Sequence, residues 1–487
     1  MKEFCFLCTN IIRKLYVIDI LIMTIAIVIL MLFGYALICS EHVTRINKAT
    51  VALFCGVCGW VMYMCVGPHY IQSLHGMDFM NYLGDGAYSV RAVNEYIYQH
   101  VFVRHMVQMC CIVMYLLATM AIVEVLSGNE CFDFMVNWCR VKTKWRLTCT
   151  LAACSFLLSA NLDNLSSAVI MLTILSKLVI NPRQRCLLGA IVVIATSCGG
   201  CFGVIGDVTS LLIWTSSAVT PTNYTAALIL PTIVATVIPT WLIGRMLPEH
   251  VDLKRPSLFF RGDSSALPVW QRAVMLFLGL YGLWFVPTFH RLTMLPPFLG
   301  ALCVLGVLWV VNEVFNRKRI LSAQPISLTG TRSLQYEMIQ MIMFFVGVSL
   351  CVNLLIEVGA MRHVAEVCDT YIHNIYLLSV VIGLVSAFMD NIALVMTSIS
   401  IFPIMEVQNT MPDYLAAFAQ NGQYWHLVAL SGCVGGCLLP IGSTSGYALM
   451  KHDGVGIWWY FKFITGKVFV GWIAALGVYF LVDYFLR

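Results

Sequence analysis

The stretch SANLDN at residues 159–164 recurs as SAFMDN at residues 386–391, and each copy places an Asp-Asn pair inside apolar sequence. A charged side chain at the depth of a bilayer is rare, and it usually faces a pathway, a partner or a bound ion. Two copies in one chain therefore need a shared explanation. An ion site built from two related halves provides one.

The composition is typical of a polytopic membrane protein. Of 487 residues, 60% are hydrophobic and only 11% are charged, against roughly 25% charged in soluble domains. The net charge of +5 is spread over loops and indicates no nucleic-acid partner. We predict an all-α chain in a lipid bilayer, where a spanning helix needs ~20 residues. Apolar runs of about this length lie at 17–39, 51–67, 106–126, 226–247, 274–289, 295–314, 338–355 and 457–481.

The first Asp-Asn pair lies between two basic loops, RVKTKWR at 140–146 and NPRQR at 181–185. Basic short loops mark the cytoplasmic side of a membrane, so the chain between them must enter and return. It is too short for two full spans, which need ~40 residues. We therefore predict a re-entrant hairpin whose polar tip faces protein or a water-filled cavity.

Each Asp-Asn pair is followed by a glycine-rich interruption of an apolar run. These segments are GGCFGVIGDVTS at 199–210 and GGCLLPIGSTSG at 435–446. Glycine is a poor helix former, so we expect a broken transmembrane helix at each. If the two tips enter from opposite sides, the halves are inverted repeats, as in many secondary transporters with sites at the midplane.

The repeat divides the chain into four parts. Residues 1–105 hold N-terminal spans and a polar loop, 106–247 the first transport repeat, 248–335 a linker with two spans, and 336–487 the second transport repeat.

At these motifs the sequence resembles the NhaD-type sodium/proton antiporters of the ion transporter superfamily. The resemblance also includes EHVTRINKATVAL at 41–53, MAIVEVL at 120–126 and WYFKF at 459–463. It implies a multi-pass protein of a bacterial-type inner (plasma) membrane that exchanges Na⁺ or Li⁺ for H⁺, with no enzymatic activity and no cofactor. A homodimer is one oligomeric state left open.

Carried over position by position, the resemblance assigns ion and proton binding to Ser159, Asp163, Asn164, Asp207, Thr209, Asp390, Asn391 and Ser443. Asp163, Asp207 and Asp390 are the expected Na⁺ ligands, because Na⁺ prefers oxygen donors, and we expect Na⁺ and the proton to compete for these carboxylates. One departure is Ser197, where the family usually has an asparagine.

Other interpretations remain open. Asp and Asn are also good N-caps, and the hydroxyl groups could serve backbone groups alone. A dicarboxylate or oxyanion carrier of the same superfamily is an alternative function, although it would want cationic groups or free N–H donors at the tips. An intramembrane aspartyl hydrolase, with Asp163 and Asp390 as its dyad, is a further one. We expect His426, Lys451 and Lys177 to lie at the membrane interface.

Overall fold

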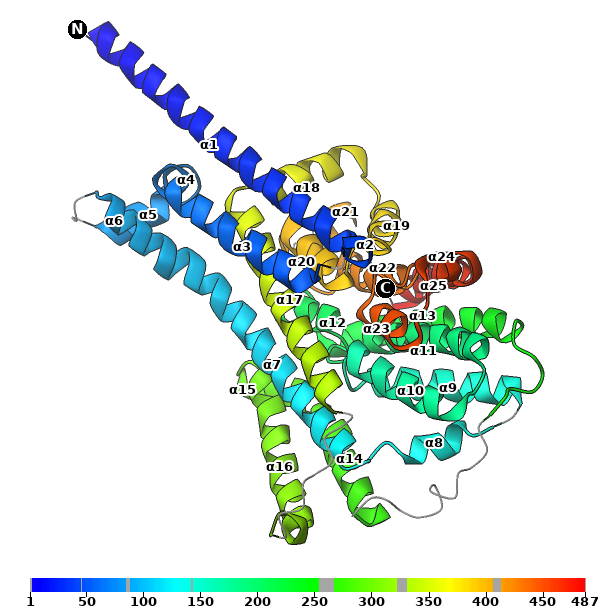
Figure 1. The fold of residues 1–487 in the computed structure, drawn as a ribbon. Helices are drawn as coiled ribbons and strands as arrows, with labels where there is room; N and C mark the ends of the chain where they lie inside the picture. The colour runs from blue at the N-terminus through cyan, green and yellow to red at the C-terminus, as the bar shows by residue number, and fades with distance from the viewer. Residues whose placement is uncertain are drawn as a thin grey trace. The chain divides into compact units, whose positions relative to one another are not determined.

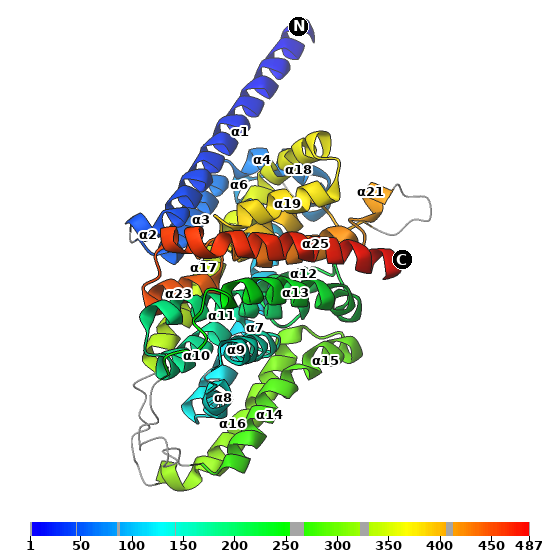
Figure 2. The ribbon, with the colours of Figure 1, turned by 90° about the vertical axis from the view of Figure 1, so that its right-hand side faces the viewer.

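The structure is a computed structural model that describes residues 2–44, 46–84, 88–141, 143–253, 267–321, 331–405 and 413–486. Every regular element in these residues is a helix, apart from three isolated β-bridges. The all-α polytopic prediction is therefore confirmed. Figure 1 follows the helices along the chain, and Figure 2 shows them after a quarter turn. Residues 254–266 and 322–330 of the predicted linker lie outside the described residues.

Eight helices in the described part are long and apolar enough to cross a membrane, and a helix pair bent by 43° adds a ninth candidate. All eight predicted apolar runs lie on these helices. The main difference concerns the run at 106–126, because its helix begins at Val90 and continues to Gly128. Much of the predicted polar loop before it is therefore helical. The candidate spans are Leu21–Cys39, Lys48–Cys65, Val90–Gly128, Pro182–Phe202, Pro221–Gly244, Val269–Leu283 with Phe285–Thr293, Pro297–Arg317, Met338–Glu357 and Ile457–Phe485.

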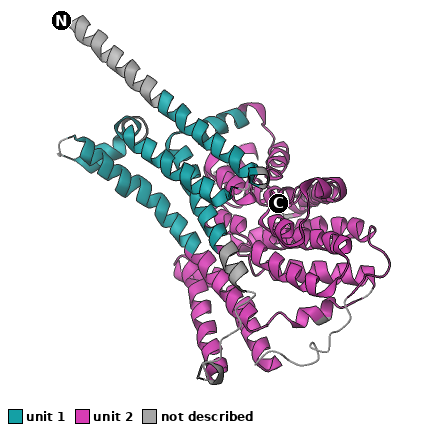
Figure 3. Cartoon of the chain, viewed as in Figure 1, with its two compact units in different colours: residues 1–113, 339–369 teal, residues 114–338, 370–487 magenta. Residues whose placement is uncertain are grey.

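The chain forms two compact units, coloured separately in Figure 3. Unit 1 comprises residues 1–113 and 339–369, and unit 2 comprises residues 114–338 and 370–487. The helices of unit 1 are α1 (Lys2–Cys39), α2 (Glu41–Thr44), α3 (Lys48–Cys65), α4 (Gly67–Leu74), α5 (Gly76–Leu83), α6 (Val90–Tyr96), the π-helix η1 (Ile97–Phe102), the start of α7 (Val103–Gly128), the end of α17 (Thr331–Glu357) and most of α18 (Ala360–Tyr371).

Small residues bring α3 and α17 close together in unit 1. A Cβ atom on Gly347 would lie 2.6 Å from the Leu53 backbone nitrogen, and one on Gly56 would lie 2.8 Å from Leu350 Cβ. The Trp60 indole donates a hydrogen bond to the Leu350 carbonyl at 3.1 Å. Glycine at these crossings therefore permits backbone contact, as is common between membrane helices.

Unit 2 contains both copies of the repeated motifs. Its remaining helices are α8 (Phe134–Cys139), α9 (Lys144–Ser159), α10 (Asn164–Leu178), α11 (Pro182–Phe202), α12 (Val208–Thr215), α13 (Pro221–Gly244), α14 (Val269–Leu283), α15 (Phe285–Thr293), α16 (Pro297–Leu321), α19 (Ile375–Ser386), α20 (Asn391–Ile401), α21 (Asp413–Ala416), α22 (Gln423–Gly436), α23 (Thr444–Asp453), α24 (Ile457–Tyr460), the π-helix η3 (Phe461–Thr465) and α25 (Gly466–Leu486). The long α13 and α25 lie side by side, as Figure 2 shows.

Helices α9 and α10 form the first helical hairpin. Thr143, just before α9, forms a bridge with His250, and Val179, just after α10, forms one with Leu253. Both ends of the hairpin therefore lie beside the same short segment, and the chain returns to the side from which it came. This is the geometry that the basic flanking loops predict.

The second hairpin, α19 and α20, also returns to one place. The His373 ring, before α19, stacks on the Tyr414 ring with centroids 4.0 Å apart. The Met405 amide, after α20, donates to the Phe418 carbonyl at 3.1 Å. Both ends thus lie against the segment that leads into α22, whereas residues 406–412 lie outside the described residues.

Candidate ion-binding site

Glycines of the broken helices contact their own hairpins in the same way in both repeats. A Cβ atom on Gly199 would lie 2.2 Å from the Phe156 carbonyl oxygen, and one on Gly435 would lie 2.4 Å from the Gly383 carbonyl oxygen. The Ile-Gly glycine, six residues after the second glycine of each Gly-Gly pair, makes an equally close contact in both repeats. Cβ atoms on Gly206 and Gly442 would lie 2.9 and 2.3 Å from the carbonyl oxygens of Ser159 and Ser386. The GGCxxxIG pattern thus holds each break against a hairpin tip.

The helix that follows each broken helix also contacts the break in the same way in both repeats. The Tyr224 hydroxyl on α13 donates to the Cys201 carbonyl at 2.8 Å, and the Tyr460 hydroxyl at the end of α24 donates to the Cys437 carbonyl at 3.1 Å. Each tyrosine follows its cysteine by 23 residues. These carbonyls lie at the breaks, where the helix itself offers them no partner. The structural repeat therefore comprises a hairpin, a broken helix and the helix that follows.

Four short-chain polar residues cap the half-helices at the tips and breaks. Asp163 Oδ2 accepts from the Ser166 amide at 3.0 Å, and Asp390 Oδ1 accepts from the Ile392 amide at 3.1 Å. Asp207 forms a capping box with Ser210 at the start of α12, and the Ser443 hydroxyl accepts from the Gly446 amide. The capping role that the sequence left open is therefore present at all four positions. It satisfies N–H donors of the helix starts.

Asp207 is the centre of a buried polar cluster that both repeats supply. Its Oδ2 accepts from the Thr209 hydroxyl at 2.5 Å within the first repeat. From the second repeat, the Cys433 thiol approaches the same oxygen at 3.6 Å and the Asn391 amide at 3.5 Å. Asp207 is 4% exposed, and the other three side chains are also buried. A buried carboxylate of this kind is a rare and costly feature, and it marks a candidate ion site.

A second contact between the repeats mirrors this cluster. The Thr209 hydroxyl lies 3.2 Å from the Cys433 thiol, and the Ser197 hydroxyl lies 2.9 Å from the Ser445 hydroxyl. Ser197 and Cys433 both stand two residues before the Gly-Gly pair, whereas Thr209 and Ser445 both stand three residues after the Ile-Gly glycine. The two pairs are therefore equivalent, with the repeats exchanged. The second pair is extended by Ser443, whose hydroxyl lies 3.4 Å from that of Ser445.

The first hairpin tip leaves polar atoms unused. The Ser159 hydroxyl donates to Asn164 Oδ1 at 2.8 Å, and both side chains are buried. Asp163 Oδ1 and Ser167 Oγ are buried and have no hydrogen bond of standard geometry in the described part of the chain. Asp163 also interacts electrostatically with Asp207. Buried oxygens without donors are the groups that a hard cation would bind.

The second tip reaches the site through Asn391 rather than through its aspartate. Asn391 donates to Asp207, as described, and its Oδ1 is another buried atom without a hydrogen bond of standard geometry among the described residues. The backbone amide of Asn391 also donates to the Gly442 carbonyl at 3.2 Å. Asp390 is buried and holds the start of α20. Of the predicted residues, Asp207, Thr209 and Asn391 are thus in direct contact.

Two participants in the contacts between the repeats, Cys433 and Ser445, were not predicted from the sequence. Ser445 lies in the second glycine-rich segment and Cys433 two residues before it; the equivalence of Cys433 with Ser197, at the same distance from the two Gly-Gly pairs, was a usable signal. His426 is 4% exposed and contacts the Tyr479 hydroxyl at 3.1 Å through Nδ1. His426 is buried within the protein, in the first turn of α22, which packs against α11, α13, α19 and α25. The expectation that it lies at the membrane interface stays a prediction. Lys451 is exposed, and Lys177 approaches the Asp133 carboxylate to 4.0 Å.

Comparison with known proteins identifies the relatives of this chain. A family model described as "Citrate transporter" matches residues 20–419. Sodium/proton antiporter 2 from Arabidopsis thaliana is 31% identical over 77% of this chain and 86% of the relative. Sodium/proton antiporter 1 from the same plant is 29% identical over 94% of this chain and 72% of the relative. The Na(+)/H(+) antiporter NhaD of Vibrio cholerae is 26% identical over 77% of this chain and 78% of the relative.

These matches extend across both repeats, and the relatives are named as antiporters, so the chain is a transporter and not an enzyme. Together with eight candidate spans, they make it a multi-pass membrane protein. Na⁺/H⁺ exchange is the activity that the names of the antiporter relatives state. The chain belongs to the family of the citrate-transporter model and, within it, to the NhaD-type sodium/proton antiporters.

Proposed function

We propose that this protein exchanges Na⁺ or Li⁺ for H⁺ by alternating access of one site, in a bacterial-type inner membrane. The carboxylates of Asp163, Asp207 and Asp390 bind cation and proton in turn. Asn164, Asn391, Ser159, Thr209 and Ser443 supply further oxygens or orient the carboxylates. The observation that carries the proposal is the Asp207 carboxylate, buried between the repeats and contacted from both.

The chemistry of the cluster favours a small hard cation. Carboxylate, amide and hydroxyl oxygens are the donors that such ions prefer, and Asp163 Oδ1 and Asn391 Oδ1 have no donor in the described part. A proton on the carboxylate removes the negative charge that the cation needs, so the two ligands exclude one another. Exchange follows when the occupied site faces the two sides of the membrane alternately.

The contacts between repeats support a rocking motion. Thr209 with Cys433 and Ser197 with Ser445 join the breaks of the two repeats directly. A rotation of one repeat against the other would change these contacts and the ligands of Asp207 together. We infer that the repeats are inverted, because basic loops flank the first hairpin whereas the loop after the second hairpin carries Glu406 and Asp413, and basic loops mark the cytoplasmic side.

An organic anion carrier is the second candidate, since the matching family model is described as a citrate transporter. Anions bind at free helix N-termini. Here the starts of α10, α12 and α20 are each capped by the protein's own aspartate. An anion would meet three buried carboxyl groups at these positions. The site therefore favours cation transport.

Everted membrane vesicles that contain the protein test the proposal. In vesicles with an acid interior, added Na⁺ or Li⁺ should dissipate the pH gradient, whereas choline should not. Radiolabelled citrate uptake into the same vesicles tests the second candidate. Citrate uptake without any cation-driven gradient loss between pH 7 and 9 would replace the antiporter proposal with an anion carrier.

A further inference from the structure

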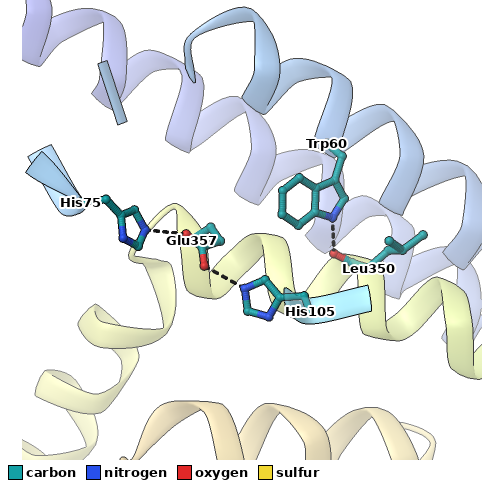
Figure 4. A network of polar contacts seen from close by, with 5 residues as sticks. All are labelled: Trp60, His75, His105, Leu350 and Glu357. Atoms are coloured by element: carbon teal, nitrogen blue, oxygen red, sulfur yellow. Dashed lines mark hydrogen bonds and ion pairs between the residues drawn. The ribbon is translucent and has the colours of Figure 1, made fainter. Parts of the chain in front are cut away.

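Unit 1 contains a buried carboxylate that two histidines hold. Glu357, the last residue of α17, is 8% exposed. Its Oε2 lies 2.9 Å from His75 Nε2, and its Oε1 lies 2.8 Å from His105 Nε2. Figure 4 shows Glu357 between the two imidazole rings, with one ring at each carboxylate oxygen. The three side chains form what we call the His-Glu-His cluster.

The cluster joins three separate places of the unit 1 fold. His75 lies at the junction of α4 and α5, His105 in the first turn of α7, and Glu357 at the end of α17. The π-helix η1 immediately precedes α7, and π-helical turns are frequent at functional sites. Both imidazoles must carry a proton on Nε2 to donate to the carboxylate. Further protonation of either ring therefore occurs at Nδ1 and leaves the contact intact.

A polar cavity opens onto the cluster. It has a volume of about 770 Å³ and is lined by all three cluster residues. The elements around it contribute further titratable or charged groups, namely Asp78, Tyr82, Tyr96, His100 and Arg104. Tyr63 of α3 also interacts electrostatically with Glu357. A cavity of this size and polarity gives water, and hence protons, access to the buried carboxylate.

The arrangement suits a proton better than a metal ion. The two ring nitrogens lie on different oxygens of one carboxylate, so they do not converge on a common point. No group of three His, Cys, Asp or Glu side chains in the described residues is arranged to hold a metal ion. The cluster instead combines one buried negative charge with two bases whose ordinary pKa lies near neutrality.

The surroundings of His75, which lies outside the membrane-spanning segments, strengthen its affinity for a proton. Its hydrogen bond to Glu357 raises the pKa of the imidazole, and the charges of Glu357 and Asp78 add to this effect. Burial and the Arg104 charge oppose it but do not cancel it. His75 therefore keeps its proton to a higher pH than an ordinary histidine does.

We propose that His75, Glu357 and His105 form a second proton-binding site of this protein, which shares no residue with the Asp207 cluster. When protonated, the cluster holds the α4–α5 junction, the start of α7 and the end of α17 together as an ion pair. When it loses its proton, the carboxylate keeps neutral donors only, and the three elements separate more readily. Unit 1 thus responds to pH independently of the bound Na⁺.

Infrared difference spectra of the full-length protein, taken between pH 6 and pH 9 without Na⁺, test this proposal. The wild-type protein should show a histidine ring signal with a midpoint above pH 6.5, and His75→Gln should abolish it or shift it by more than one pH unit. His363→Gln is the matched control, because His363 is exposed and contacts only the exposed Glu366 among the described acids. It should leave the signal unchanged.

A second variant guards against misfolding. His105→Gln removes the second histidine of the cluster. A variant is used for the test only if its helix content matches that of the wild-type protein, and one such variant is enough. Glu357→Gln should lower the midpoint of the His75 signal, because the anion that attracts the proton is gone. A wild-type protein with no histidine signal above pH 6.5, or one whose signal survives His75→Gln and His105→Gln unchanged, would overturn the proposal. Transport is not measured, so this result is independent of the proposed exchange.

Discussion

The Thr209 hydroxyl of the first repeat lies 3.2 Å from the Cys433 thiol of the second repeat, and both groups contact the same oxygen of Asp207. The contact matches that between Ser197 and Ser445 at 2.9 Å. Two equivalent pairs therefore join the breaks of the broken helices. Only one pair includes a carboxylate, because Ser443 occupies the position of Asp207 in the second repeat. The two halves of the site are thus equivalent in fold and different in charge.

Removal of the Thr209 hydroxyl should impair exchange. Thr209→Val keeps the shape of the side chain but removes a hydrogen bond to a charged group, which contributes about 1.5–3 kcal/mol. We expect the apparent Na⁺ affinity to fall by about ten- to a hundredfold. Gradient dissipation as a function of Na⁺ concentration measures this change. Thr215→Val on the same helix is the control, because the Thr215 hydroxyl contacts only carbonyls of its own helix, and it should have little effect.

A serine should replace Cys433 without loss of exchange. Cys433→Ser puts a hydroxyl donor beside Asp207 at the position where the other repeat has Ser197. We expect the exchange rate to stay within about threefold of wild type, whereas Cys433→Ala should weaken it, since the donor is lost. Equal rates in the serine and alanine variants would show that the Cys433 contact is dispensable.

The glycines at the breaks should not tolerate a methyl group. Gly442→Ala would place Cβ 2.3 Å from the Ser386 carbonyl oxygen, and such overpacking costs about 1–3 kcal/mol. We expect a lower melting temperature in detergent. Gly477→Ala is the control, because no atom lies within 4 Å of its Cβ position. If both variants melt at the same temperature, the close contact between break and hairpin does not exist in the folded protein.

An ion pair of Arg185 and Asp453 joins α11 to α23, with its atoms 2.5 Å apart. The Asp453 side chain is fully buried, the Arg185 side chain is 25% exposed, and His452 Nδ1 lies 3.4 Å from the same carboxylate oxygen. Loss of the arginine leaves a buried carboxylate without its guanidinium partner, at a cost of at most about 3–5 kcal/mol. Arg185→Met should therefore destabilise strongly. The double variant with Asp453→Asn should be more stable than Arg185→Met alone, as thermal unfolding would reveal. Additive losses would exclude a direct coupling.

The stability of the protein should depend on pH through His75. A histidine whose pKa is raised on folding contributes stability that is fully present below its ordinary pKa of 6.5 and is lost as the pH rises through the raised value. The melting temperature should therefore fall over that range, and His75→Gln should flatten the dependence. A wild-type melting temperature that is constant from pH 6 to 9 would contradict this expectation.

Much of the fold follows from the sequence, because apolar length and loop charge act locally. The return of the first hairpin to its side of entry was predicted from two basic loops, and the breaks from glycine-rich segments. Contacts across the repeats were not predicted. The sequence marks Cys433 by its place two residues before the second Gly-Gly pair, but its contact with Asp207 depends on how α22 packs on α12. The His-Glu-His cluster carries no motif, since His75 and Glu357 lie 282 residues apart in the chain.

Proton release by the purified protein tests the central claim most directly. We expect that Na⁺ added to the detergent-solubilised protein in weak buffer releases protons, because the cation displaces them from the shared carboxylates. Asp207→Asn should abolish this release, and Asp133→Asn, which alters a surface carboxylate near Lys177, should preserve it. No release from the wild-type protein, or undiminished release from Asp207→Asn, would contradict competition between Na⁺ and H⁺ at this site.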